Sequence, residues 1–371
     1  MKRLLPLAIA LAALCAQPVS AQIADGFYHI KNVTTGRCIS INDTNPKNYK
    51  VSLSAGDVNL GGLRTYLSYD TVSVSPSCVI YVKRLDNGQY DLCGQGSSLY
   101  TMSSGRGVDF NFRSDKTFKI SASAQGMTKT LSDGSPSTKD SWLMSRLTTT
   151  QIWDARPVNT TDEYIGIRPD VRTADGHYYG TIYAGFSFRL VSDGMAAFCI
   201  DNAGGAGFTM SQIEEDVIPG ATPVVIRCTS SNPAENKIEP VIDGSSFEGA
   251  NCLRGVFCSI SVAGHHNTTP FDALTMRVLG LNDKGELAFV SKPPAGRLYK
   301  DLFLMANKAY LKVNPKDEDV MTLGGSTSID AVRTKTNTPD GIYTLTGVRI
   351  SENTPLRPGI YIQNGKKRIV R

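Results

Sequence analysis

The sequence predicts an all-β protein, and two observations support this. Short runs in which apolar and polar residues alternate recur along the chain: Cys78–Lys83, Phe118–Ser123, Thr181–Leu190, Pro223–Cys228 and Ala309–Val313. Turn-forming sequences lie between such runs: Asp86–Gly88, Asp133–Gly134, Asp175–Gly176, Asp243–Gly244 and Asp283–Gly285. The 34 glycines in 371 residues also fit a turn-rich β fold. One helical turn is expected, at Thr209–Val217, with Ser211 as its cap.

The first 21 residues are typical of a secretory signal peptide. Lys2 and Arg3 precede the apolar run Leu4–Cys15, and Val19-Ser20-Ala21 has the small–x–small pattern that a signal peptidase cuts. The apolar run is too short to span a bilayer as a stable helix. We therefore expect cleavage before Gln22 and a protein that is secreted or held at the outer membrane or cell surface. A retained N-terminal anchor is the alternative.

Charge and cysteine content limit the classes of function. Without Lys2 and Arg3 the 39 basic side chains become 37, against 34 acidic ones, a net charge of +3. This near balance argues against a nucleic-acid-binding protein, which needs a concentrated basic face. Loss of Cys15 leaves seven of the eight cysteines, so at least one thiol has no partner within the chain. Cys252 and Cys258 could close a small loop, or the cysteines could act as small buried apolar side chains.

Residues 22–158 carry three imperfect copies of a β-hairpin pattern, at Asp25–Ile41, Gly88–Met102 and Thr117–Ser132. Each copy combines an aromatic residue, an alternating strand, a Gly-containing turn and a second strand, which suggests a pseudo-threefold barrel. With Tyr28–Asn32, Thr35-Gly36 and a Q-x-W motif at Gln151–Trp153, this region resembles the β-trefoil of the ricin-type lectin family. The resemblance implies a β-trefoil-like domain with a glycan or surface ligand as partner. In that family Q-x-W is mainly a core element, so Trp153 is expected to pack inside the domain.

Residues 159–323 are predicted to form a central β-sandwich-like module. Gly176–Leu190 alternates as two strands around Gly180 or Gly185, and Val217–Cys228 is a loop followed by a buried strand. The region resembles a module that recurs in exported proteins of Bacteroidota-type bacteria. The residues that carry this resemblance are Tyr178-Tyr179, Pro219, Thr222-Pro223, Met276–Gly280 and Asn307–Tyr310. The resemblance implies no particular activity.

The C-terminal part begins with a polar stretch of small residues, 324–339, which is predicted to be a linker. Residues 340–371 resemble, in shortened form, the type IX sorting region of Bacteroidota secreted proteins, through Gly341–Arg349, Leu356, Pro358–Ile362 and Lys366–Arg371. We expect three short strands that end in a basic edge, and the resemblance implies secretion machinery as a partner. The alternative is a charged end that keeps an edge strand from pairing with neighbours.

The sequence predicts no catalytic, cofactor-binding or metal-ligating residue and no cofactor. Adjacent His265 and His266 would point to opposite faces of a strand, and a polar turn is favoured over a metal site. Gly204–Gly207 lacks the Lys-Ser/Thr of a phosphate-binding loop, and the sequence contains no G-x-S-x-G. Exposed aromatic residues could stack on sugars, but burial in the core is favoured for each candidate: Tyr66, Tyr69, Tyr100, Trp142 and Tyr178.

These observations favour an exported, non-catalytic binding or adhesion protein that engages glycans through its N-terminal domain. Two alternatives stay open. A secreted hydrolase with a site between the two large domains would place a His and a carboxylate within hydrogen-bonding reach in one cleft. A purely structural surface component would have no concave aromatic pocket.

Overall fold

The computed structural model describes residues 22–41, 52–54, 57–59, 63–67, 72–73, 76–93, 107–124, 127–133, 140–144, 149–159, 163–242, 244–256, 269–299, 301–324, 332–333, 342–344, 349–350, 358–363 and 366–370. Strands account for nearly all regular structure among these residues, and the helical elements are two single 3-10 turns, η2 (Pro76–Cys78) and η3 (Pro233–Glu235). The predicted all-β class is therefore confirmed. In this described part of the chain, no helix has the length and apolarity to cross a membrane.

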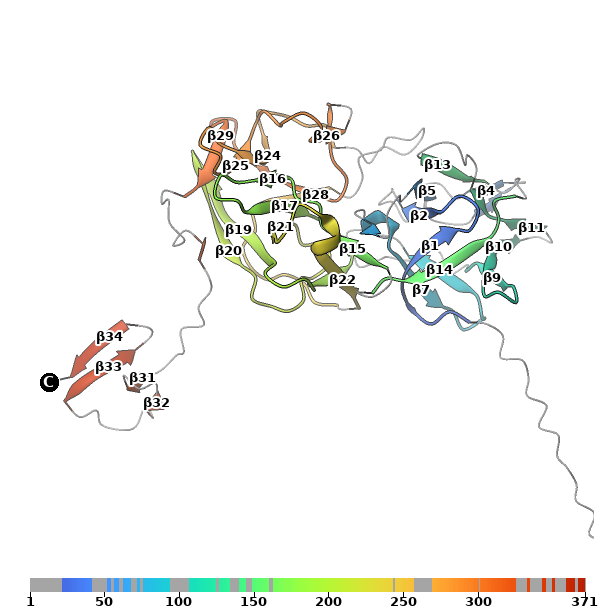
Figure 1. Ribbon diagram of the computed structural model, residues 1–371, viewed down its shortest axis with the longest axis horizontal. Helices are drawn as coiled ribbons and strands as arrows, with labels where there is room; N and C mark the ends of the chain where they lie inside the picture. The colour runs from blue at the N-terminus through green and yellow to red at the C-terminus, as the bar shows by residue number, and fades with distance from the viewer. Residues whose placement is uncertain are drawn as a thin grey trace, which may run out of the picture.

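The N-terminal unit is a curled sheet centred on β1 (Gly26–Asn32), which pairs with three antiparallel neighbours (Figure 1). These are β14 (Trp153–Pro157), β2 (Arg37–Ile41) and β7 (Ile80–Arg84). The remaining strands of this sheet are β5 (Leu63–Leu67), β8 (Tyr90–Cys93), β9 (Asp109–Phe112), β10 (Phe118–Ala124), β11 (Met127–Thr130), β12 (Ser132–Asp133) and β13 (Asp140–Met144). A separate hairpin joins β3 (Ser52–Ser54) to β4 (Asp57–Asn59).

Two of the three predicted hairpin copies are present as paired strands. The first is β1 with β2, and the third is β10 with β11. Of the second copy, the described residues include only β8 and the turn before it, so the threefold repeat stays a prediction. Trp153 is fully buried in the core of this unit and its indole N–H donates to the Leu131 carbonyl oxygen at 3.3 Å. The expectation that the Q-x-W tryptophan packs in the core is confirmed.

The central unit contains a long sheet and a short one. Its long sheet runs β16 (Val171–Arg172), β17 (Tyr178–Ile182), β21 (Val224–Cys228), β19 (Ala196–Gly204), β20 (Gly207–Gln212), β29 (Val320–Leu323), β25 (Leu287–Val290), β24 (Met276–Leu281), β28 (Lys308–Lys312) and β23 (Leu253–Val256). The sheet curls so that β17 and β28 approach each other. The Tyr183 N–H, just after β17, donates to the Asn307 carbonyl oxygen, just before β28, at 2.9 Å. Phe198, Phe208 and Phe289 belong to the core inside the curl.

The short sheet of the central unit covers the outer face of the long one. It runs β18 (Ser187–Leu190), β22 (Lys237–Val241), β15 (Tyr164–Gly166) and β6 (Val72–Ser73), and a further hairpin joins β26 (Leu298–Tyr299) to β27 (Phe303–Leu304). Alternate residues of β19 and β21 therefore face two different cores, as expected for strands buried on both faces.

Two predictions made from the sequence for the central unit can be compared with its structure. Gly176–Leu190 does form two strands, and they separate around Gly185, while Gly180 lies within β17. The helical turn predicted at Thr209–Val217 is wrong, because β20 continues to Gln212. Instead of capping a helix, the Ser211 hydroxyl donates to Asp201 Oδ2 of the neighbouring strand at 2.7 Å, and the Thr209 hydroxyl donates to Asp201 Oδ1.

The N-terminal and central units share one apolar layer, which we call the junction core. Phe27, Val79, Cys93 and Val158 of the first unit pack in the same cluster as Ile165, Phe186, Phe188, Ile226 and Ile238 of the second. In addition, the backbone of β6, from the N-terminal part of the chain, pairs in parallel with β15. The boundary predicted after Val158 therefore passes through a continuous core.

The C-terminal residues add strands in two places. Within the predicted linker, β30 (Val332–Arg333) pairs in parallel with β20 of the central unit. The last strands, β31 (Ile342–Thr344), β32 (Arg349–Ile350), β33 (Gly359–Gln363) and β34 (Lys366–Val370), form a sheet of their own, drawn in red in Figure 1. It contains four strands where the sequence predicted three, because β31 and β32 are separate strands that pair antiparallel.

Candidate functional site

The candidate site is an open hollow in the N-terminal unit, with a volume of about 360 Å³. Its lining consists of Gln22, Arg84, Gly88, Tyr90, Phe110, Phe112 and Arg113, and we call it the aromatic hollow. Pockets of about 300–1,000 Å³ with an apolar lining and a few polar groups are the usual size and character of small-ligand sites. The hollow therefore lies at the small end of that range.

Strand pairing brings these residues together from separate segments. Arg84 of β7 lies opposite Tyr90 of β8, and Tyr90 forms an antiparallel bridge with Val108, just before β9. Phe110 and Phe112 are two residues apart on β9, so both point to the same face of the sheet. The ends of two hairpins thus place aromatic rings and a guanidinium on one side.

The aromatic rings are held by contacts with one another. Tyr90 and Phe110 stack with centroids 4.5 Å apart, and Phe110 and Phe118 stack at 4.4 Å. Phe112 lies 5.4 Å from Phe118 and 6.2 Å from Phe110 in tilted and edge-on geometry. Tyr90 and Phe110 are buried, whereas Phe112 is half-buried. The hollow therefore offers a rigid apolar floor with Phe112 as its more accessible ring.

The rim of the hollow is polar and positively charged. Arg84 Nη1 donates to the Gln22 Oε1 atom at 2.6 Å, and the Arg84 backbone N–H donates to Asp25 Oδ1 at 2.8 Å. Arg113 Nη2 lies 4.0 Å from Asp115 Oδ2. Asp115 is already engaged by the Thr117 hydroxyl at 2.6 Å, and this hydrogen bond is the main reason that its pKa is lowered. The described lining contains two arginines and no acidic residue.

A second polar cluster lies between the N-terminal and central units, and we call it the junction cluster. His29 Nδ1 lies 2.9 Å from Glu163 Oε2, and Lys31 Nζ donates to Glu163 Oε1 at 2.6 Å. Burial alone would raise the pKa of Glu163, but the hydrogen bonds from His29 and Lys31 outweigh it and hold this pKa below the usual 4.5. An ionised carboxylate only accepts, so Nδ1 of His29 carries the shared proton.

The junction cluster is buried, and this decides what it can do. His29 is fully buried and Glu163 is 6% exposed, so among the described residues the pair has almost no contact with solvent. The Nε2 atom of His29 is also buried and has no hydrogen-bond partner among the described residues. A His–carboxylate contact of the kind that the hydrolase alternative requires is thus present between the two units, and it is buried.

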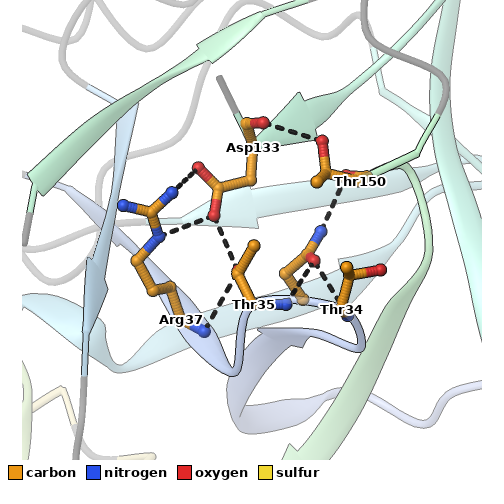
Figure 2. Close-up of polar contacts among 6 residues, drawn as sticks. Thr34, Thr35, Arg37, Asp133 and Thr150 are labelled. Carbon is orange, nitrogen blue, oxygen red and sulfur yellow. Dashed lines mark hydrogen bonds and ion pairs between the residues drawn. The ribbon is translucent and has the colours of Figure 1, made fainter. Parts of the chain in front are cut away.

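A third cluster is the buried ion pair of Arg37 and Asp133, in which both side chains have no exposed surface (Figure 2). Arg37 Nε donates to Asp133 Oδ2 at 2.7 Å, and Arg37 Nη2 donates to Asp133 Oδ1. The Thr35 hydroxyl donates to the same carboxylate at 2.7 Å, and the Thr150 hydroxyl donates to the Asp133 carbonyl oxygen at 2.7 Å. These contacts fix the turn between β1 and β2 against the strands that surround it.

The candidates from the sequence that the structure describes do not belong to the lining of the aromatic hollow. Tyr178 is half-buried and packs against the junction core, as expected, with the Arg172 guanidinium 5.5 Å from its ring centre. His177 Nδ1 lies 3.0 Å from Asp175 Oδ2 in an exposed turn. Gly205 adopts a φ of +59° at the β19–β20 turn. Several candidates lie outside the residues or side chains that the structure describes, namely Tyr66, Tyr69, Tyr100, Trp142, Cys258, His265 and His266.

Sequence reasoning missed Arg84, Phe110, Phe112 and Arg113, which line the aromatic hollow. The stretch Asp109–Arg113 does carry a signal, because two aromatic residues alternate with polar ones and an arginine follows. Reading this as a site requires knowing that Tyr90 and Arg84 lie beside it, and only the strand pairing shows that.

Two buried cysteines, Cys38 and Cys228, are poorly suited to act as nucleophiles. Burial raises the pKa of Cys228 to about 12 and, with a smaller contribution from Cys78, raises the pKa of Cys38 well above its usual range. Both are therefore thiols at neutral pH, whereas nucleophilic attack needs the thiolate. Within the described ranges, no group of three or more His, Cys, Asp or Glu side chains is placed to hold a metal ion.

Comparison of the chain with protein-family models, with curated proteins and with solved structures gives no match.

Proposed function

We propose that the chain is an exported binding protein that takes up a glycan in the aromatic hollow of its N-terminal unit, without catalysing a reaction. The observation that carries the proposal is the hollow itself, in which a half-buried ring, Phe112, lies beside hydrogen-bonding groups of Gln22, Arg84 and Arg113. The signal peptide and the resemblance of residues 22–158 to ricin-type lectins support export and sugar binding.

The physical basis is the two-sided character of a sugar ring. Its C–H groups form an apolar face that stacks on an aromatic ring, and its hydroxyl groups need hydrogen-bond partners at the edge. The hollow supplies both, because the stacked rings of Tyr90, Phe110 and Phe118 keep Phe112 in place and guanidinium and amide groups stand at the rim. A preformed site of this kind orders few groups on binding, which favours affinity.

The test is a glycan array probed with the full chain, repeated with Phe112→Ala and with Tyr310→Ala as a matched aromatic variant on β28 of the central unit. We expect a set of glycans that the full chain and Tyr310→Ala retain and that Phe112→Ala loses. A blank array, or glycans that Phe112→Ala retains in full, would refute the proposal.

We also propose that residues 340–371 are read by secretion machinery and that the protein reaches the cell surface. The support is the ordered resemblance to a sorting region and the basic run at Lys366–Arg368, which lies on the edge strand β34. Deletion of 340–371 should leave the protein in the periplasm, as measured by fractionation and mass. An unchanged location would instead favour a structural end, in which the charges keep β34 from pairing with other molecules.

A further inference from the structure

We infer that the ligand of the aromatic hollow is an acidic sugar residue, whose carboxylate or sulfate group is bound by Arg84 and Arg113. This inference rests on the proposed function and narrows it from glycans in general to those that carry a negative charge. It follows from the charge of the rim, the partners of the two arginines and the position of Phe112.

Among the described residues, no carboxylate is bound to the guanidinium of Arg84 at the rim. Its guanidinium is exposed and Nη1 donates to a neutral amide oxygen, Gln22 Oε1, which does not offset its charge. Among the described residues, no carboxylate forms an ion pair with Arg84 within 4.0 Å, because Asp25 accepts from its backbone N–H instead. A guanidinium presents five N–H donors in a planar fork that matches a carboxylate or sulfate, so donors remain for an anion.

Arg113 provides a second positive charge that a bound anion can contact. Its contact with Asp115 is long, at 4.0 Å, and both side chains are about half exposed, at 51% and 55%. Exposed pairs of this kind contribute little because water screens them. Asp115 also accepts hydrogen bonds from the Thr117 hydroxyl and backbone N–H, at 2.6 and 3.1 Å, so it stays satisfied if Arg113 turns toward a bound anion.

Phe112 and the size of the hollow favour a sugar over an anion of another kind. The ring lies against the stacked pair of Phe110 and Phe118, in edge-on and tilted contact, and is half-buried, so part of its surface remains for stacking. A volume of about 360 Å³ accommodates one or two rings rather than a long chain. The charged groups lie at the rim and the apolar groups at the floor, which suits a ring that stacks below and carries its anionic group at the edge.

The experiment is titration calorimetry of the full chain with four probes: tetragalacturonate, neutral galactotetraose, a sulfated galactotetraose and a short polyglutamate peptide. The variants are Arg84→Gln and Arg113→Gln. Their matched controls are Lys83→Gln and Lys119→Gln, which remove the same charge from exposed positions of β7 and β10. Circular dichroism checks that each variant keeps the fold.

We expect one of the acidic saccharides to bind and neutral galactotetraose to bind much more weakly. Each arginine variant should lose about 10- to 100-fold in affinity, the range for a hydrogen bond to a charged group, while the lysine controls stay near the parent value. Binding should also weaken as salt is added. The carboxylated and sulfated probes show which anionic group is preferred.

Three results would overturn the inference. Neutral galactotetraose that binds as well as the acidic probes, with no effect of the arginine variants, would leave the proposed glycan binding intact and remove the acidic ligand. Polyglutamate that binds as tightly as the saccharides would remove the sugar. If no saccharide binds, on the array or in titration, the proposed function fails together with this inference.

Discussion

The N-terminal and central units each bury an arginine completely, and they stabilise it in different ways. Arg37 in the N-terminal unit forms a two-pronged ion pair with Asp133, which is equally buried. Arg277 in the central unit donates instead to four main-chain carbonyl oxygens, those of Ala273, Met276, Asp317 and Glu318, at 2.6–3.0 Å. Its nearest carboxylate, Asp319, lies 3.8 Å away and is 71% exposed.

A buried guanidinium can thus be stabilised by the carboxylate of an acidic side chain, as in Arg37, or by backbone carbonyl oxygens, as in Arg277. Arg37 loses the buried carboxylate of its two-pronged ion pair if Asp133 is removed, whereas the dipoles that surround Arg277 are part of the backbone and no single side chain supplies them. Glu163 of the junction cluster is an intermediate case, since its side chain is 8% exposed and two basic residues share it. The unfolding free energy lost when an acid is replaced should therefore be larger the more deeply that acid is buried.

The largest effect is expected for Asp133→Ala, because it removes the buried carboxylate that forms a two-pronged ion pair with the fully buried Arg37 guanidinium. Breaking such a pair costs about 3–5 kcal/mol of unfolding free energy. Urea unfolding followed by circular dichroism measures this loss. The double variant Arg37→Met with Asp133→Leu should recover most of it, because neither charge is then buried. A single variant that unfolds like the parent chain would show that the pair is dispensable.

The next effect is expected for Arg277→Met, which removes the donors of four carbonyl oxygens. Leaving buried acceptors unsatisfied costs about 1–3 kcal/mol, and the exposed side of the 317–319 loop lets water satisfy some of them. The same unfolding measurement applies, with the exposed Arg254→Met on β23 as the control. Equal stability of the two variants would mean that the carbonyl contacts contribute nothing.

A smaller, pH-dependent effect is expected for Glu163→Gln. The pKa of Glu163 is lowered in the folded protein, so its contribution is fully present above about pH 4.5 and is lost as the pH falls through the folded-state pKa below that value. At pH 7 the variant should be less stable by about 1–2 kcal/mol, since two charge-assisted hydrogen bonds are weakened. Unfolding curves between pH 3 and 7 should show the two proteins converging in acid; a constant difference would contradict this.

The smallest effect is expected for Asp319→Asn, which changes stability by less than about 0.5 kcal/mol because exposed ion pairs contribute little. It is the matched counterpart of Asp133→Asn, with the same change of carboxylate to amide beside a buried arginine. If the two variants lost equal stability, burial would not be what distinguishes the two acids.

Local patterns in the sequence predicted much of the secondary structure. The alternating runs correspond to β7, β10, β21 and β28, since period-two alternation is a property of the strand itself. The turns at Gly88, Gly176 and Gly285 have positive φ, of 84°, 93° and 75°, a conformation that glycine adopts without strain.

Non-local pairing explains what the sequence did not predict. Thr209–Val217 has the residues of a helix cap, but Asp201 on the neighbouring strand binds the Thr209 and Ser211 hydroxyls, and the segment continues β20 as far as Gln212. The aromatic hollow depends on β7, β8 and β9 meeting at one end, and no spacing within any of them encodes that. His29 shares a face of β1 with Phe27, which packs in the junction core, but nothing within β1 encodes the approach of Glu163 to that face.

The junction core has a mechanical consequence. A force that pulls on the two ends of a protein first opens the weakest connection between its parts, and in chains with independent domains that connection is a linker. Here Phe27, Val79 and Val158 pack in the same layer as Phe186 and Ile238, so the described parts of the two large units are joined by a continuous core. Under tension they should resist together and give way in a single step, which keeps the aromatic hollow intact until the whole body yields.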